Sequence, residues 1–270
     1  MNLARKQSRD WPLRLNRAAF YLAVAGAIGL ALAGPGYRAG FMPLIGGLLC
    51  VATALLLFVL AFALGIAGLL WRRRGGGDLR WRAIVTVIVA GAVTIDAGVW
   101  LTRALRTPPI HDISTDLDDP PQFHAAIALR RAAGAVNPPE YQREVKTPAG
   151  TINVPDAQRR AYPDIAPLML RLPAARAFAL AERAAHAMPW VIDAADPAAG
   201  RIEATATTVY FGFKDDVVIR VRAVGTGSVL DVRSESRIGV GDVGTNAARV
   251  RDYLNRVVAL AGKGAVIERR

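Results

Sequence analysis

Side chains that could bind an anionic ligand are concentrated between residues 220 and 249. Arginines alternate there with acids, serines and an asparagine, and guanidinium groups bind carboxylate or phosphate through paired hydrogen bonds. Glycines precede an amphipathic helix in the same stretch, and the backbone N–H groups of a helix N-terminus also favour an anion. The candidate ligand-binding residues are Arg220, Arg222, Asp231, Arg233, Ser234, Ser236, Arg237, Asp242, Asn246 and Arg249.

Three other motifs, HDISTD, AYPDIAP and FGFKDD, hold the remaining candidates, which are His111, Asp112, Asp116, Tyr162, Asp164, Asp215 and Asp216. Paired acids can act as general acid and base when their surroundings separate their pKa values. Acids and serines beside prolines are also typical of turns, and Asp215 and Asp216 are expected in an exposed loop. No HExxH, CxxC or EF-hand motif is present. We therefore expect neither a metal site nor a cofactor, and we assign no catalytic residue.

An antiparallel hairpin carries most of the first set of candidates. Residues 217–224 and 229–237 both alternate between apolar and charged side chains, and Gly-Thr-Gly-Ser separates them. With Thr226 and Gly227 as the central turn residues, Ala223 lies opposite Leu230 and Arg222 opposite Asp231. This register places the apolar side chains on one face and the charged side chains on the other.

The elements around this hairpin predict the fold. Two further strands are expected at 190–195 and 201–211, and amphipathic helices at 173–188 and near 243–261, the second capped by Asp242 or Thr245. The helices should cover the apolar face, while the charged face is expected to be solvated. The prediction is an α+β two-layer domain with an antiparallel sheet of about four strands and two packed helices.

Three N-terminal transmembrane α-helices are predicted before this domain. The chain is 53% apolar, and its apolar runs, of which only the third holds a charge (Asp96), are long enough to cross a bilayer near 18–37, 43–70 and 83–102. The predicted organisation is a basic N-terminus at 1–17, a three-helix region at 18–102 and a soluble domain at 103–270. Ala31-Leu32-Ala33 also resembles a signal-peptide cleavage site, and this alternative for the first span stays open.

The distribution of charge indicates a topology and argues against nucleic acid as a partner. Of the net charge of +12, residues 1–102 carry +8 (11 basic against three acidic residues) and the rest carries +4. All of these basic residues except Arg38 lie before the first span or between the second and third, including Arg72, Arg73 and Arg74, which predicts that both segments are cytoplasmic. We therefore expect a multi-pass protein of the cytoplasmic (inner) membrane with a periplasmic C-terminal domain.

Four ordered motifs carry a resemblance to a known family. HDISTD at 111–116 with PPQF at 120–123, QRRAYPDIAP at 158–167, FGFKDDVVIRV at 211–221 and DVRSESRIGVGDVGTNAARVR at 231–251 resemble the bacterial family called domain of unknown function 1499. The resemblance covers about residues 107–261. It implies a shared fold and a setting in the cell envelope, and it implies no established activity.

Two functional hypotheses follow. The first is a non-catalytic binding or scaffolding module that recognises an anionic small molecule, a lipid head group or an envelope protein, with the lipid bilayer as its other partner. The alternative is a carboxylate-dependent envelope hydrolase using acids such as Asp215, Asp216 or Asp231. Because no nucleophile elbow or catalytic triad order is recognisable, the sequence favours the first hypothesis without deciding whether the protein is an enzyme.

Overall fold

The computed structural model describes residues 2–71, 78–147 and 150–269. The chain divides into two compact units. The first comprises Met1–Leu105 with Tyr210–Gly212, and the second comprises Arg106–Val209 with Phe213–Arg270. We describe each unit by itself.

Three long apolar helices form the first unit, as predicted: α1 (Asn2–Arg38), α2 (Leu44–Leu70) and α3 (Asp78–Arg106). The stretches Trp11–Arg38, Leu44–Leu70 and Trp81–Arg106 are long and apolar enough to cross a membrane. Small residues let α1 and α2 pack closely, since a Cβ atom at Gly29 would lie 3.1 Å from the Ala54 side chain. The arginines at 72–74 lie outside the described residues.

The second unit is built on a seven-stranded antiparallel sheet, whereas the sequence predicted about four strands. Its order is β5-β6-β7-β8-β4-β9, and β1 also pairs with β8. The strands are β1 (Asp112–Ser114), β4 (Leu168–Leu170), β5 (Trp190–Asp196), β6 (Arg201–Thr207), β7 (Lys214–Val224), β8 (Gly227–Ser236) and β9 (Val266–Arg269). The three unpredicted strands have only three or four residues each, too few to show a periodic pattern. A separate hairpin joins β2 (Glu144–Thr147) to β3 (Gly150–Asn153).

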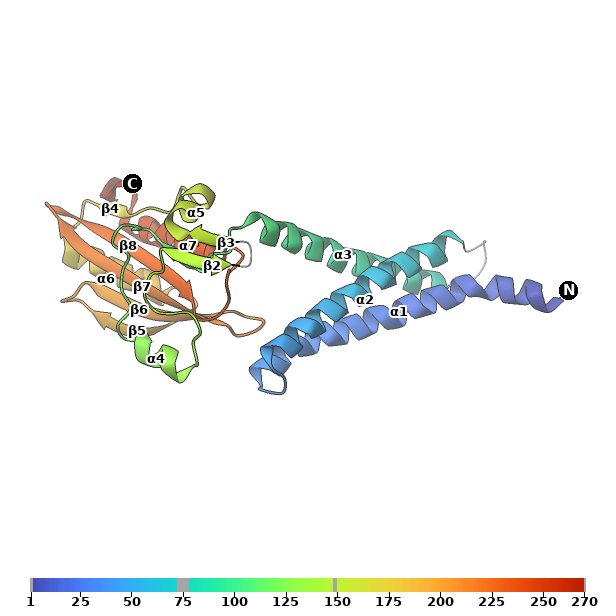
Figure 1. Cartoon of the computed structure of the whole chain (residues 1–270). Helices are drawn as coiled ribbons and strands as arrows, with labels where there is room; N and C mark the ends of the chain where they lie inside the picture. Colours follow the sequence, from blue (N-terminus) through green and yellow to red (C-terminus); the bar gives the residue numbers. More distant parts are fainter. Residues whose placement is uncertain (1, 72–77, 148–149, 270) are drawn as a thin grey trace. The chain divides into compact units, whose positions relative to one another are not determined.

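Helices α6 (Ala174–His186) and α7 (Thr245–Ala261) cover one face of the sheet, as predicted (Figure 1). Phe178, Ile219 and Leu254 belong to the buried core between these layers. Tyr253 is also buried there, and its hydroxyl donates to the Ala181 carbonyl over 2.9 Å. Two short helices, α4 (Ala126–Ala132) and α5 (Val154–Ala161), and a 3-10 turn at Lys263–Ala265 complete the second unit.

The β7–β8 hairpin turns one residue earlier than predicted, with Gly225 and Thr226 at its centre, and this changes the strand register by two residues. Val224 pairs with Gly227, and Arg220 rather than Arg222 lies directly opposite Asp231. Gly225 has a φ of +58° at the first central turn position, as in a type II′ turn, and glycine adopts this conformation without strain. Because the shift is an even number of residues, every side chain keeps its predicted face.

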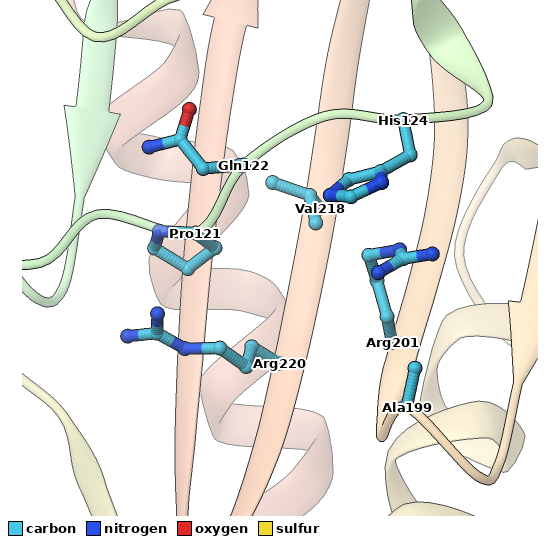
Figure 2. Close-up of a pocket in the computed structure, with 7 residues that line it drawn as sticks. All are labelled: Pro121, Gln122, His124, Ala199, Arg201, Val218 and Arg220. Atoms are coloured by element: carbon cyan, nitrogen blue, oxygen red, sulfur yellow. The ribbon is translucent and has the colours of Figure 1, made fainter.

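The expectation of a solvated charged face is wrong. Residues 115–139, which we call the covering segment, cross this face and include α4 (Figure 2). Glu203, Asp216 and Arg233 of the sheet are each at most 1% exposed. Asp215 and Asp216 lie in β7 and not in a loop, because β6 ends at Thr207, before the predicted end at 211.

Candidate functional site

Arg233 is the centre of an ionic network beneath the covering segment. Its side chain is 0% exposed, and its Nε and Nη2 donate to the two carboxylate oxygens of Asp112 over 2.9 and 2.8 Å. Nη2 also contacts Glu235 at 3.2 Å, and the guanidinium carbon lies 4.7 Å from the centroid of the Phe123 ring. The carbonyls of Pro121 and Pro139 accept further hydrogen bonds. Arg233 thus joins β8, β1 and the covering segment.

Two more arginines continue the network. Arg130 of α4 donates to Asp216 at 2.6 Å and to Glu235 at 3.0 Å. Arg237 donates to the same Asp216 at 2.6 Å and to Thr205 at 3.1 Å. Burial raises the pKa of Glu235 to about 9, and the charge of Asp112 acts in the same direction against the nearby guanidiniums.

A second cluster lies at the edge of the covering segment. Asp231 is 0% exposed and accepts from Arg220 at 3.1 Å and from Arg222 at 3.0 Å. Both arginines also bind Asp116 and Asp119 of the covering segment. Burial raises the pKa of Asp231, while Arg220 and Arg222 oppose that shift. The cluster therefore fastens the covering segment to β7 and β8.

The helix-covered face holds a third polar cluster around Asn246. This side chain is 0% exposed, donates to the His111 carbonyl and to the Ser236 hydroxyl, each at 2.9 Å, and accepts from the Ser234 hydroxyl at 2.7 Å. Arg249 binds Ser234, Asn246 and Asp215, the last at 2.6 Å.

The start of α7 differs from the sequence prediction in two respects. Val243, expected on its apolar side, precedes the helix with a φ of +52°, and buried Asn246 occupies that side instead. The N-cap residue is Gly244 and not Asp242 or Thr245, although the Asp242 carboxylate accepts from the backbone N–H groups of Gly244 and Asn246. Burial raises the pKa of Asp242, against those two hydrogen bonds.

Two predicted residues lie apart from these clusters. Asp164 binds Arg251 of α7 through two hydrogen bonds of 2.5 and 2.6 Å. The guanidinium of Arg251 lies 5.2 Å from the centroid of the Tyr162 ring. This group joins the segment after α5 to α7.

A pocket of about 200 Å³ lies on the covered face of the sheet, beside the covering segment (Figure 2). Pro121, Gln122 and His124 come from the covering segment, whereas Arg201 comes from β6, and Val218 and Arg220 come from β7. The described residues that line it include no acid: they are Pro121, Gln122, His124, Ala199, Arg201, Val218 and Arg220.

The sheet register sets two like charges beside this pocket. Arg201 of β6 pairs directly with Arg220 of β7, an arrangement that is destabilising unless another group compensates it. Glu203, which is 1% exposed, accepts from Arg201 Nε at 3.1 Å and from the backbone N–H groups of His124 and Ala126. The Asp116, Asp119 and Asp231 carboxylates hold Arg220 from its other side.

Arg220 also carries a buried donor without a partner. Its Nε atom is buried and makes no hydrogen bond within the described part of the chain. An unpaired buried donor costs free energy. Glu203 is fully engaged, and the pocket therefore presents guanidinium, imidazole and amide groups to an occupant.

Sequence reasoning named Arg220 but missed the other polar residues of the pocket. Arg201 and Glu203 alternate on the same face as Arg220, and this pattern was the available signal. His124 and Gln122 belong to an irregular segment whose path no local pattern indicates. Among residues 2–71, 78–147 and 150–269, no three His, Cys, Asp or Glu side chains are arranged to hold a metal ion.

Comparisons with known proteins place the second unit in a family. A search of curated proteins found no match to the chain. The family model described as "Protein of unknown function (DUF1499)" matches residues 112–257, which include strands β1 to β8 and most of α7. This match covers more than half of the 270 residues, and the protein is therefore a member of the DUF1499 family.

Proposed function

We propose that the second unit is a non-catalytic binding module that holds a small anionic group, a carboxylate or a phosphate, in the pocket of His124, Arg201 and Arg220. The observation that carries this proposal is the pair of directly opposed arginines beside a pocket whose described lining has no acid. An anion in this pocket would accept charge-assisted hydrogen bonds from the guanidiniums.

Burial distinguishes the other candidate arginines from Arg220, which lines the pocket and whose side chain is 18% exposed. Arg233 and Arg237 are 0% and 5% exposed, and each binds carboxylates of the chain itself. Their contacts support a role in holding the covering segment, which supplies one wall of the pocket.

Binding is also better supported than hydrolysis. Asp215, Asp216 and Asp231 each bind an arginine, and none lines the pocket. Asp215 and Asp216 are adjacent in β7 and point to opposite faces, so they cannot act together on one substrate.

The proposed location is the outer side of the cytoplasmic membrane, with the binding unit in the periplasm. Arg14 and Arg17 lie at the start of the first span, and Arg82 lies at the start of the third. Basic residues favour the cytoplasmic side, and three crossings then bring the residues after α3 to the other side. This orientation gives the pocket access to soluble anions of the envelope.

Equilibrium dialysis of the full chain in lipid nanodiscs tests the proposal. The probes are [³²P]phosphate and [¹⁴C]succinate, and the comparison is between wild type and an Arg201→Ala variant. A charge-assisted hydrogen bond contributes about 1.5–3 kcal/mol, so the variant should bind the preferred probe at least about tenfold more weakly. If neither probe binds saturably to the wild type, the proposal is refuted.

Arg222→Ala is the matched control. Arg222 lies on the same face of β7 as Arg220 and binds the same three aspartates, but it is outside the pocket and its side chain is 43% exposed. This variant should bind within about twofold of wild type, because Arg222 is outside the pocket and Asp231 keeps its ion pair with Arg220. Equal losses in both variants would indicate a general charge effect and would contradict a site at Arg201.

A further inference from the structure

One end of the sheet presents three exposed valines on neighbouring connections. Val136 is 78% exposed in the loop after α4, Val209 is 89% exposed after β6, and Val240 is 50% exposed after β8. Isolated exposed valines are ordinary on a protein surface. These three are notable because backbone hydrogen bonds bring their connections to the same end of the sheet.

Those hydrogen bonds surround the end of β8. The Arg237 carbonyl accepts from the N–H groups of Val136 and Asn137, and the Asn137 side chain donates to the carbonyls of Ser236 and Gly239. The Arg237 N–H donates to the carbonyl of Lys214, the first residue of β7. The connections that carry Val136, Val209 and Val240 therefore emerge side by side.

The chain itself restricts where this end of the sheet can be. Helix α3 ends at Arg106 and β1 begins at Asp112, so at most about 20 Å of extended chain separates them. Gly241 packs against this short connection, since a Cβ atom there would lie 3.0 Å from the Pro109 Cα. Pro109 is only three residues beyond α3, a distance of at most about 10 Å.

We propose that this end of the sheet docks on the lipid surface of the membrane that α3 crosses, with Val136, Val209 and Val240 inserted at the head-group level. The occupant is a bilayer because the tether holds these side chains beside the surface from which α3 emerges. The inference requires only that α3 crosses the membrane, and it holds for either orientation of the protein. It is independent of the proposed anion pocket.

Charge and position agree with a bilayer partner. Lys214 and Arg131 are exposed beside two of the connections, and exposed cations near a membrane are attracted to anionic lipids. Val224, at the far end of β7, lies about 30 Å from Lys214, because β7 has 11 residues. Val224 is 48% exposed and therefore provides a matched position at the opposite end of the same strand.

Site-directed spin labelling of the full chain tests the proposal. Cys50→Ala removes the native thiol, and single cysteines then replace Val136, Val209, Val240 or Val224 in nanodiscs of phosphatidylethanolamine and phosphatidylglycerol (3:1). Oxygen partitions into lipid, whereas the nickel complex NiEDDA stays in water. Labels at 136, 209 and 240 should collide more with oxygen than with NiEDDA, and the label at 224 should show the reverse.

The other outcomes overturn the inference. If the three labels are as accessible to NiEDDA as the label at 224, this end of the sheet is in water. If they are shielded from both reagents, they pack against protein and not lipid. Anion binding by the same labelled chains is an independent readout, so failure of membrane docking remains distinguishable from failure of the pocket.

Discussion

Replacement of Arg233 by alanine should destabilise the second unit more than any surface change. The side chain is 0% exposed and is bound to Asp112 by two hydrogen bonds and to Glu235 by a third. Removing one member of a buried ion pair costs about 3–5 kcal/mol, because the remaining charge is left without a partner. A domain of ordinary stability has about 5–15 kcal/mol in total, so the loss is a large fraction of it.

Pulse proteolysis of the full chain in detergent micelles, over a urea series, measures this loss. Arg222→Ala is the control, because its side chain is 43% exposed and its ion pairs should contribute less than about 1 kcal/mol. Adding Asp112→Asn to the Arg233 variant should cost less than Asp112→Asn alone, since the two residues are coupled. If the urea midpoints of Arg233→Ala and Arg222→Ala coincide, the buried network does not hold the covering segment.

Two further predictions concern pH and the rim of the pocket. The pKa of Glu235 is raised to about 9 from 4.5, so between these values the folded state retains a proton that the unfolded state loses, and stability should fall as pH rises from about 5 to 9. Glu235→Gln should reduce this dependence of stability on pH, measured as urea midpoints at pH 5, 7 and 9. If the pH dependence is unchanged in the variant, another group causes it. Gly200 has a φ of +63°, and a Cβ atom there would lie 2.2 Å from the Val221 carbonyl oxygen. Gly200→Ala should therefore destabilise the second unit by more than about 1 kcal/mol and weaken binding at adjacent Arg201. Gly134 is the control, because it is exposed and also has a positive φ, but it has open space around it. Gly134→Ala should leave binding unchanged.

Periodicity was sufficient to predict the parts of the fold in which one face is apolar. The three membrane-length helices, the two helices on the sheet and the inward faces of β6, β7 and β8 all follow from apolar spacing. The hairpin register was wrong by two residues because either turn preserves the alternation. Only the backbone conformation at Gly225 distinguishes them.

The path of the covering segment could not be predicted, and this segment buries charged side chains that were expected to face solvent. Arg233, Glu235 and Asp216 alternate as solvent-facing residues do, yet their buried partners, such as Arg130 and Asp112, lie about a hundred positions away in the chain. No local sequence pattern predicts such pairing, because ionic contacts over long sequence separations depend on the path of the connecting segments.

The sequence by itself therefore determined the membrane-length helices, the class of the second unit and the faces of its main strands, because burial of apolar side chains imposes a period of 2 or about 3.6 residues. The tertiary structure decided which arginines are fully enclosed and which also line a pocket. Arg220 and Arg233 lie on the same face of neighbouring strands, but Arg233 is enclosed by Asp112, Glu235 and Phe123, while Arg220 borders the pocket opposite Arg201. Their different surroundings arise from where residues 115–139 cross the sheet.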